Sequence, residues 1–200
     1  MDARMEKQLA FALEIDKVKN IFRQTHLSKN GRNENDAEHS WHLAVMALLL
    51  QEYANETVDV LRVISMVLVH DMVELDAGDT YAYDETGNAT KREREVAAAE
   101  RIFHILPEDQ AAFFRGLWDE FEEAETPEAK FAHTLDNIQP MMLNDATGGK
   151  AWREHQVKLS QVMGRQKKTA EGSDVLWKYA RENMISKNVK EGAIIEDCKL

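Results

Sequence analysis

The chain is poor in the residues that interrupt or cross-link a fold. It has 3 prolines, 9 glycines and 1 cysteine among 200 residues. A lone cysteine, Cys198, cannot close an internal disulfide, and this is typical of a reducing compartment. So little proline and glycine leaves no linker that would divide the chain. We therefore expect one domain over residues 1–200 and a cytoplasmic location.

Two further absences limit the partners of the protein. Its net charge is −11, from 25 Lys and Arg against 36 Asp and Glu, and no basic stripe offsets this excess. Such a surface repels a polyanion, so we expect no polymeric nucleic acid as partner. The sequence also lacks a run of about 18 apolar residues, and its first residues are too charged for a signal peptide. We expect neither a membrane span nor a targeting segment.

Apolar residues at helical spacing are abundant. Phe11, Ile15, Val18 and Phe22 recur on one face of a helix, and no segment alternates as a strand does. The pattern predicts an all-α fold of about seven or eight helices. The expected helices cover about residues 3–23, 36–53, 57–75, 91–106, 108–125, 126–145, 150–166 and 173–185, and a polar tail follows them.

Several residues predict where these helices begin and end. Asn35 and Glu38 have the spacing of a capping box. Thr126 suits an N-cap, and Pro127 suits the first helical position after it. Gly78 is expected to end the third helix. Residues 79–90, which follow it, read as a loop.

The most informative segment is an apolar run that ends in His70, Asp71 and Glu74. On a helix these three side chains lie close together. They could be solvated at a helix end, but the apolar run before them argues for burial. A buried carboxylate is costly unless a cation or metal ion neutralises it, and neutral imidazole is the commonest metal ligand. The segment therefore favours a metal site.

A metal site needs further ligands from other helices. His39 lies in the first turn of the second helix, and Asp136 interrupts an apolar set in the middle of the sixth. Both are candidates. His42, one turn beyond His39, could compete as a ligand, although a supporting position beside the ligands is the preferred interpretation. We expect the other histidines to be structural or on the surface, namely His26, His104, His133 and His155.

An isolated His, an adjacent His-Asp pair and a distant Asp, all on expected helices, resemble the HD-domain metal-dependent phosphohydrolases. The likeness is greatest to the branch of the bacterial 5'-deoxynucleotidases and their HD-domain relatives, and it covers roughly residues 8–145. "RNENDAEHSWHLAV" looks like the first-ligand segment, "HDMVE" like the HDxxE signature and "LDN" like the last ligand. The resemblance implies an HD-domain helical bundle whose metal ligands are His39, His70, Asp71 and Asp136.

The resemblance also implies a cofactor and roles for other residues. This ligand set suits one divalent transition metal ion, such as Mn, Co, Fe, Ni or Zn. Glu74 would act as acid or base, and Asp79 would orient water and substrate. Arg23 and Arg32 are the candidate phosphate contacts. In the deoxynucleotidases an aromatic residue follows the first arginine and crowds the 2' position, whereas Gln24 stands here, so a deoxyribose preference is not predicted.

The implied activity is hydrolysis of a small phosphate ester, a (deoxy)nucleoside 5'-monophosphate, to nucleoside and phosphate. One alternative is a phosphodiesterase or nucleoside polyphosphate hydrolase of the same superfamily, and a single His-Asp pair argues against it. Another is a non-catalytic regulatory module that a structural metal ion stabilises. A structural site is closed by its ligands and needs no acid such as Glu74 beside it.

The segment "FFRGLWDEF" is unusually apolar. Its large residues spread over more than one face of a helix, and they are Phe113, Phe114, Leu117, Trp118 and Phe121. Burial on two sides within one chain would explain this pattern. An exposed patch would instead mark an interface, and members of the resembled branch are commonly two-fold dimers. We expect a homodimer with a helix-on-helix interface.

Overall fold

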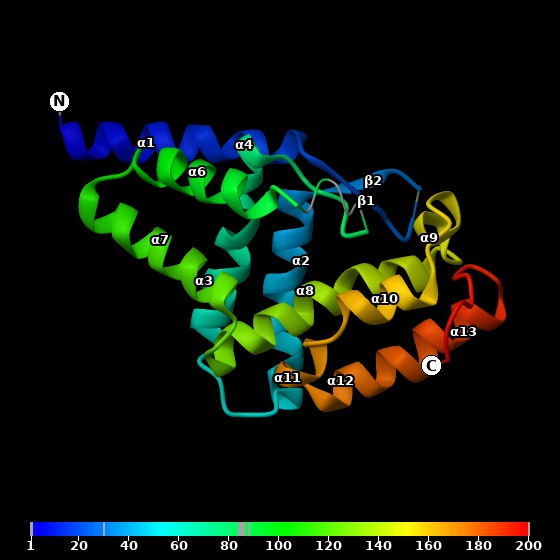
Figure 1. Ribbon diagram of the computed structural model, residues 1–200. Coiled ribbons are helices and arrows are strands. Elements are labelled where there is room, and N and C mark those ends of the chain that lie inside the picture. The colour runs from blue at the N-terminus through cyan, green and yellow to red at the C-terminus, as the bar shows by residue number, and fades with distance from the viewer. Residues whose placement is uncertain (1, 30, 84–86, 88, 200) are drawn as a thin grey trace.

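The computed structural model describes residues 2–29, 31–83, 87 and 89–199, and these form helices and one small sheet (Figure 1). The α-helices are α1 Ala3–Ile15, α2 Asp36–Leu50, α3 Val60–Val69, α4 Glu74–Ala77, α6 Lys91–Phe103, α7 Glu108–Glu123, α8 Pro127–Ala146, α9 Lys150–Glu154, α10 Leu159–Arg165, α11 Thr169–Gly172, α12 Asp174–Tyr179 and α13 Ser186–Lys190. The expected all-α class is confirmed, and each of the eight expected segments contains helix, in several cases as shorter pieces. In the described part of the chain, no helix has the length and apolar character needed to cross a membrane.

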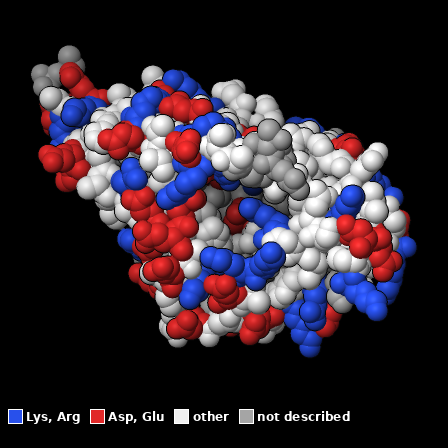
Figure 2. All heavy atoms as spheres, viewed as in Figure 1, with Lys and Arg blue, Asp and Glu red and all other residues white. Residues whose placement is uncertain are grey.

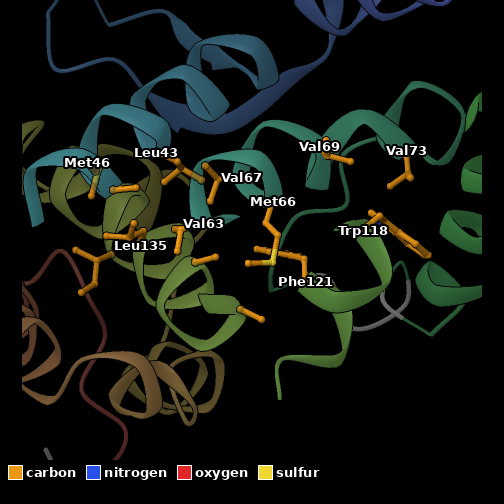
Figure 3. Close-up of a cluster of buried hydrophobic side chains, with 14 of the residues drawn as sticks. Leu43, Met46, Val63, Met66, Val67, Val69, Val73, Trp118, Phe121 and Leu135 are labelled. Atoms are coloured by element: carbon orange, nitrogen blue, oxygen red, sulfur yellow. The ribbon is translucent and has the colours of Figure 1, made fainter. Parts of the chain in front are cut away.

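The centre of the fold is α3, which packs against α2, α7 and α8. Almost all of its residues are apolar, and the Asp59 side chain caps it by accepting hydrogen bonds from two backbone amides. Each fully buried Val or Met side chain contributes about 1.5–3 kcal/mol relative to an exposed one. Figure 3 shows the apolar side chains that meet in this cluster, among them Leu43, Met46, Val63, Met66, Val67, Trp118, Phe121 and Leu135.

The residues expected to set helix ends do so. The Asn35 side chain accepts from the backbone amide of Glu38, and the Glu38 side chain accepts from that of Asn35, which completes the capping box of α2. Thr126 caps α8, with Pro127 in its first turn. Gly78 follows α4 with φ of 74°, a conformation that glycine adopts without strain. The expected loop over residues 79–90 includes 84–86 and 88, which lie outside the described residues.

The prediction of helix up to residue 23 and of no strand is wrong. α1 ends at Ile15, a 3₁₀ turn follows over Asp16–Asn20, and β1 (Phe22–His26) then pairs antiparallel with β2 (Asn33–Asn35). The pairing is irregular between Phe22 and His26, so the burial of β1 does not alternate and its sequence lacks the period of a strand. As a result, Arg23 lies on a strand beside α8.

Two other expected helices are interrupted. The third is divided into α3, a 3₁₀ turn over His70–Val73, and α4. The seventh is divided into α9 and α10 at Gln156, whose φ is 50°. Helical structure also continues past residue 185 through α13, and Ala193 and Ile194 are buried beyond it. The end of the chain is therefore packed on the domain and is not merely a polar tail.

The large apolar residues of α7 belong to the core. Trp118 is 0% exposed, Leu117 and Phe121 are buried, and Phe114 is half-buried. Of the five, Phe113 alone is exposed, at 54%. α7 packs against α3, α6 and α8, so a wide arc of its surface is covered within the chain. Burial of α7 on several sides within the chain therefore explains the apolar pattern, and the homodimer stays a prediction.

Candidate metal centre

The structure brings together the four residues that the resemblance implies as metal ligands. α2 contributes His39, the 3₁₀ turn after α3 contributes His70 and Asp71, and α8 contributes Asp136. His39 Nε2 lies 3.0 Å from Asp136 Oδ1 and 3.9 Å from Asp71 Oδ2. His70 Nε2 lies 3.1 Å from Asp71 Oδ1 and 3.8 Å from Asp136 Oδ1. Residues from three separate elements thus converge on one point.

The hydrogen bonds made by Nδ1 of the two imidazoles turn Nε2 of each ring toward the carboxylates, where it can ligate a cation. His70 Nδ1 lies 2.9 Å from the carbonyl oxygen of Val67, which can only accept, so Nδ1 carries the proton. His39 Nδ1 is held in the same way, 3.1 Å from Oε1 of Gln139. His70 Nε2 is buried and has no hydrogen-bond partner in the described part of the chain. An orphaned nitrogen facing two carboxylates fits a divalent metal ion.

A polar network behind His39 supports its orientation. Gln139 donates from Nε2 to Glu34 Oε1 at 2.7 Å and lies 3.1 Å from His42 Nδ1. His42 therefore stands one step behind the ligand, as the preferred interpretation of the sequence had it. Glu34 and Gln139 were not singled out in the sequence. Partners of this kind fix the tautomer and ring orientation of a metal-binding histidine.

The histidines and aspartates of the centre shift one another's pKa values. Burial opposes the charged form of His70, but Asp71 and Asp136 outweigh it and raise its pKa to about 10. Burial likewise opposes the charged form of Asp136, yet His39 and His70 hold its pKa well below the usual range. Burial also opposes the charged form of Asp71, but His70 and Arg23 hold its pKa far below the usual range. Both carboxylates therefore remain ionised at neutral pH, as metal ligands must.

A group of three buried carboxylates adjoins the four converging residues, and one of its members, Asp36, is not a candidate in the sequence. Carboxylate oxygens of Asp36, Asp71 and Glu74 lie within 4.8 Å of one another, and all three residues are buried. Burial, followed by repulsion from Asp71, raises the pKa of Asp36 to about 7 and that of Glu74 well above its usual value. In the sequence, Asp36 marks only the expected start of the second helix. Its position three residues before His39 was the available signal.

Arg23 lies within this acidic group. Its Nη1 atom is 2.7 Å from Asp71 Oδ2 and 3.5 Å from Asp36 Oδ1, and its side chain is 14% exposed. Burial disfavours the guanidinium charge, but Asp71 and Glu74 more than compensate and raise the pKa of Arg23. The arginine that the sequence suggested for phosphate binding is thus at the centre. The other candidate, Arg32, is half exposed and donates to Glu38 at 2.9 Å, away from the centre.

The centre opens into a cavity of about 520 Å³. Glu74, Asp79 and Arg23 line it beside His70, Asp71 and Asp136. Burial raises the pKa of Asp79, against the nearby charge of Arg23. Rings of Tyr81, Tyr83 and Trp152 form part of the wall. Figure 2 shows a hollow on this face with Lys and Arg side chains gathered at its edge.

Part of the cavity wall comes from the segment after α8, which the resemblance does not cover. Trp152 of α9 and Arg165 of α10 both line the cavity. The turn before α9 needs glycine, because φ is 65° at Gly148 and 72° at Gly149. A Cβ atom at Gly149 would also lie 2.3 Å from Cβ of Ala193. The "GGKAW" motif therefore positions Trp152, and this contribution was missed in the sequence.

Comparison with known proteins agrees with this geometry. A family model described as HD domain matches residues 15–177, which is most of the chain and includes all four converging residues. The chain belongs to the HD domain family. Human 5'-deoxynucleotidase HDDC2 is 30% identical over 135 residues, which are 67% of this chain and 65% of that protein. The Bos taurus protein of the same name is 31% identical over 136 residues, 67% of this chain and 64% of that one.

The HD domain chain thus spans slightly under two thirds of the length of these curated relatives. A solved structure matches over more of its length. It is a chain described as a predicted metal-dependent phosphohydrolase from Magnetospirillum magnetotacticum MS-1. The two are 47% identical and superpose with a TM-score of 0.91, which covers 96% of each chain. The fold, including the C-terminal helices, is therefore shared with that protein.

Proposed function

We propose that this HD domain protein is a divalent-metal-dependent phosphohydrolase, a 5'-nucleotidase that converts (deoxy)nucleoside monophosphates to nucleoside and inorganic phosphate. The observation that carries the proposal is the convergence of two imidazoles and two carboxylates beside a cavity that proton-transfer groups and an arginine also line. The 5'-deoxynucleotidase name of the curated relatives supports the substrate class.

The residues fit one metal ion of the transition series. His39, His70, Asp71 and Asp136 would hold Mn, Co, Fe, Ni or Zn, since the nitrogen and oxygen donors suit each of these ions. When bound, such an ion lowers the pKa of water and stabilises the negative charge of the phosphoryl group. Arg23 would donate to phosphate oxygens from the same side of the cavity as Asp71, and a guanidinium can do so with two parallel hydrogen bonds.

Two carboxyl groups would divide the proton transfers. Water attacks phosphorus, the bond from phosphorus to the 5' oxygen breaks, and that oxygen needs a proton. The raised pKa of Glu74, caused by burial and by Asp71, suits it to hold a proton and donate it to the leaving oxygen. Asp79 lines the same cavity and would orient the attacking water. The rings of Tyr81, Tyr83 and Trp152 would contact the base.

A phosphate-release screen tests the function. The protein is treated with a chelator and assayed with and without added Mn²⁺, Co²⁺ or Zn²⁺ on nucleoside 5'-monophosphates, cyclic nucleotides and nucleoside triphosphates. We expect release from the monophosphates, restored by metal. Turnover of only cyclic nucleotides or triphosphates would support the phosphodiesterase or polyphosphate hydrolase instead. No turnover by the metal-bound protein would support a regulatory module.

Three other features belong to the proposal. We infer a cytoplasmic location from the lone Cys198. We also infer a homodimer and a single domain that spans residues 1–200. The homodimer now lacks the support of α7, because the large residues of that helix are mostly buried.

A further inference from the structure

One wall of the cavity is basic and comes from α8 and the C-terminal helices. Its cations are Lys130 of α8, Arg165 at the end of α10, and Lys167 and Lys168 just before α11. We refer to these four residues as the C-terminal basic wall. In Figure 2 Lys and Arg side chains gather at the hollow, whereas Asp and Glu gather on the α7 side. In a protein of net charge −11, such a cluster focuses an anion on this wall.

The other cations that line the cavity, Arg23 and Lys91, each have a carboxylate partner. Arg23 lies 2.7 Å from Asp71, and Lys91 lies 3.3 Å from Glu95. Lys130, Lys167 and Lys168 form no ion pair with any carboxylate among the residues that the structure describes. Three lysine charges of the wall are therefore available to an anion that enters the cavity.

Within the wall, Arg165 stands nearest to the metal centre. Its Nη2 atom lies 3.5 Å from Asp136 Oδ2, and its side chain is 42% exposed. A phosphate held at the centre would therefore lie close to Arg165, which approaches Asp136, and to Arg23, which approaches Asp71. Lys167 and Lys168 are exposed, toward the mouth of the cavity, and Lys130 is half-buried. The reacting phosphate, with about two negative charges at neutral pH, can be neutralised without these lysines.

We propose that the C-terminal basic wall is a second phosphate subsite, and that the preferred substrate is a nucleoside bisphosphate. Its 5'-phosphate would be hydrolysed at the metal centre, while a phosphate on another sugar hydroxyl would bind the lysines and stay on the product. Water supplies the oxygen to phosphorus, and the 5' oxygen takes the proton. A 5'-diphosphate fits less well. Its two phosphorus atoms are joined by one bridging oxygen, so the second phosphoryl group would stay near Arg165 and would not extend to the exposed lysines. This inference rests on the proposed function and narrows its substrate.

Kinetics on three substrates test the subsite. kcat/KM for phosphate release is measured with adenosine 5'-monophosphate, adenosine 3',5'-bisphosphate and adenosine 5'-diphosphate. The test variant is Lys167→Ala/Lys168→Ala. The matched control is Lys178→Ala/Lys190→Ala, which removes the same charge from exposed positions outside the cavity. An exposed charge pair contributes a factor of about 1.4 to 5 to an equilibrium constant. Two lysines should therefore make kcat/KM for the bisphosphate about 10-fold higher than kcat/KM for the monophosphate.

We expect this ratio in the wild type and the control, and a ratio much nearer one in the test variant, in which Lys130 is the one remaining lysine of the wall. The preference should also weaken with added salt. Equal kcat/KM for monophosphate and bisphosphate in the wild type would overturn the inference, as would a preference of undiminished size in the test variant. Preference for the diphosphate would place the second phosphoryl group beside the first and would overturn the bisphosphate assignment.

Binding without turnover separates this inference from the proposed function. Calorimetry with adenosine 3'-monophosphate and metal-free protein reports the second subsite alone, because this probe has no 5'-phosphate. We expect about 10-fold weaker binding by the test variant than by the control. Indistinguishable binding would refute the subsite. Absence of phosphate release from every substrate, with the binding difference intact, would instead refute the proposed hydrolase.

Discussion

Replacing Glu74 by glutamine would remove a proton-transfer group while preserving its shape. Glu74 is buried, lines the cavity and has a carboxylate oxygen within 4.8 Å of one from Asp71. Its Oε2 atom has no hydrogen-bond partner in the described part of the chain. Glu74 is also outside the four proposed ligands. We therefore predict that Glu74→Gln keeps the metal ion and loses activity.

The size of the loss follows from the proposed role. A general acid contributes about 100- to 10,000-fold to the rate, or about 2.7–5.4 kcal/mol of the activation barrier. The folded state should not lose stability to the same extent. Burial and repulsion by Asp71 and Asp36 favour the protonated, neutral form of Glu74, which a neutral amide matches in charge and shape.

The assay compares kcat and metal content in Glu74→Gln and Glu95→Gln. Glu95 is equally buried beside the cavity but is paired with Lys91 at 3.3 Å, and we assign it no part in the reaction. The control should keep kcat within roughly threefold of the wild type. Near wild-type turnover by Glu74→Gln would refute the proton-transfer role. Loss of the metal ion from this variant would show that Glu74 is itself a ligand.

Three further predictions concern the metal centre and assembly. Asp71→Ala should lose both metal ion and activity, and its melting temperature should fall below that of the metal-bound wild type; full metal occupancy in elemental analysis would contradict the ligand assignment. In chelated wild type, His70 has its pKa raised from 6.5 to about 10 because Asp71 and Asp136 outweigh burial, so this stabilisation is complete below pH 6.5 and is lost toward pH 10. Burial raises the pKa of Asp36 from 3.8 to about 7, which lowers stability as the pH rises over that interval. The melting temperature of chelated protein should therefore fall between about pH 6 and about pH 9. A rise would refute the pairing of His70 with Asp71 and Asp136. The homodimer predicts a light-scattering mass of about twice the 22.9 kDa of one chain, and a mass near one chain rejects it.

The elements of this HD domain that the sequence predicts well carry local signals. The capping box of Asn35 and Glu38 and the Thr126 cap each lie within a few residues, and the structure has both. The four converging residues are also predictable, because a buried His-Asp pair and an isolated Asp on an apolar face are costly without a partner. Their three-dimensional convergence follows once the helices pack as the family resemblance implies.

The elements that the sequence does not reveal depend on distant contacts. Asp36 acquires its raised pKa from burial and from Asp71, which lies far along the chain. Arg165 approaches Asp136 only because the C-terminal helices pack on α8. The irregular pairing of β1 with β2 removes the alternating burial that would indicate a strand in the sequence. Apart from the spacing between Asp36 and His39, no local pattern encodes these features, since each arises from a residue that another part of the chain brings near.

The most direct test of the account is a metal titration of activity. Chelated protein, at a concentration well above the metal dissociation constant, receives increasing Mn²⁺ while phosphate release from a nucleoside 5'-monophosphate is recorded. A single centre formed by His39, His70, Asp71 and Asp136 predicts a rate that rises linearly and saturates at one ion per chain. Release that is independent of metal, or that saturates only at two ions per chain, would contradict it.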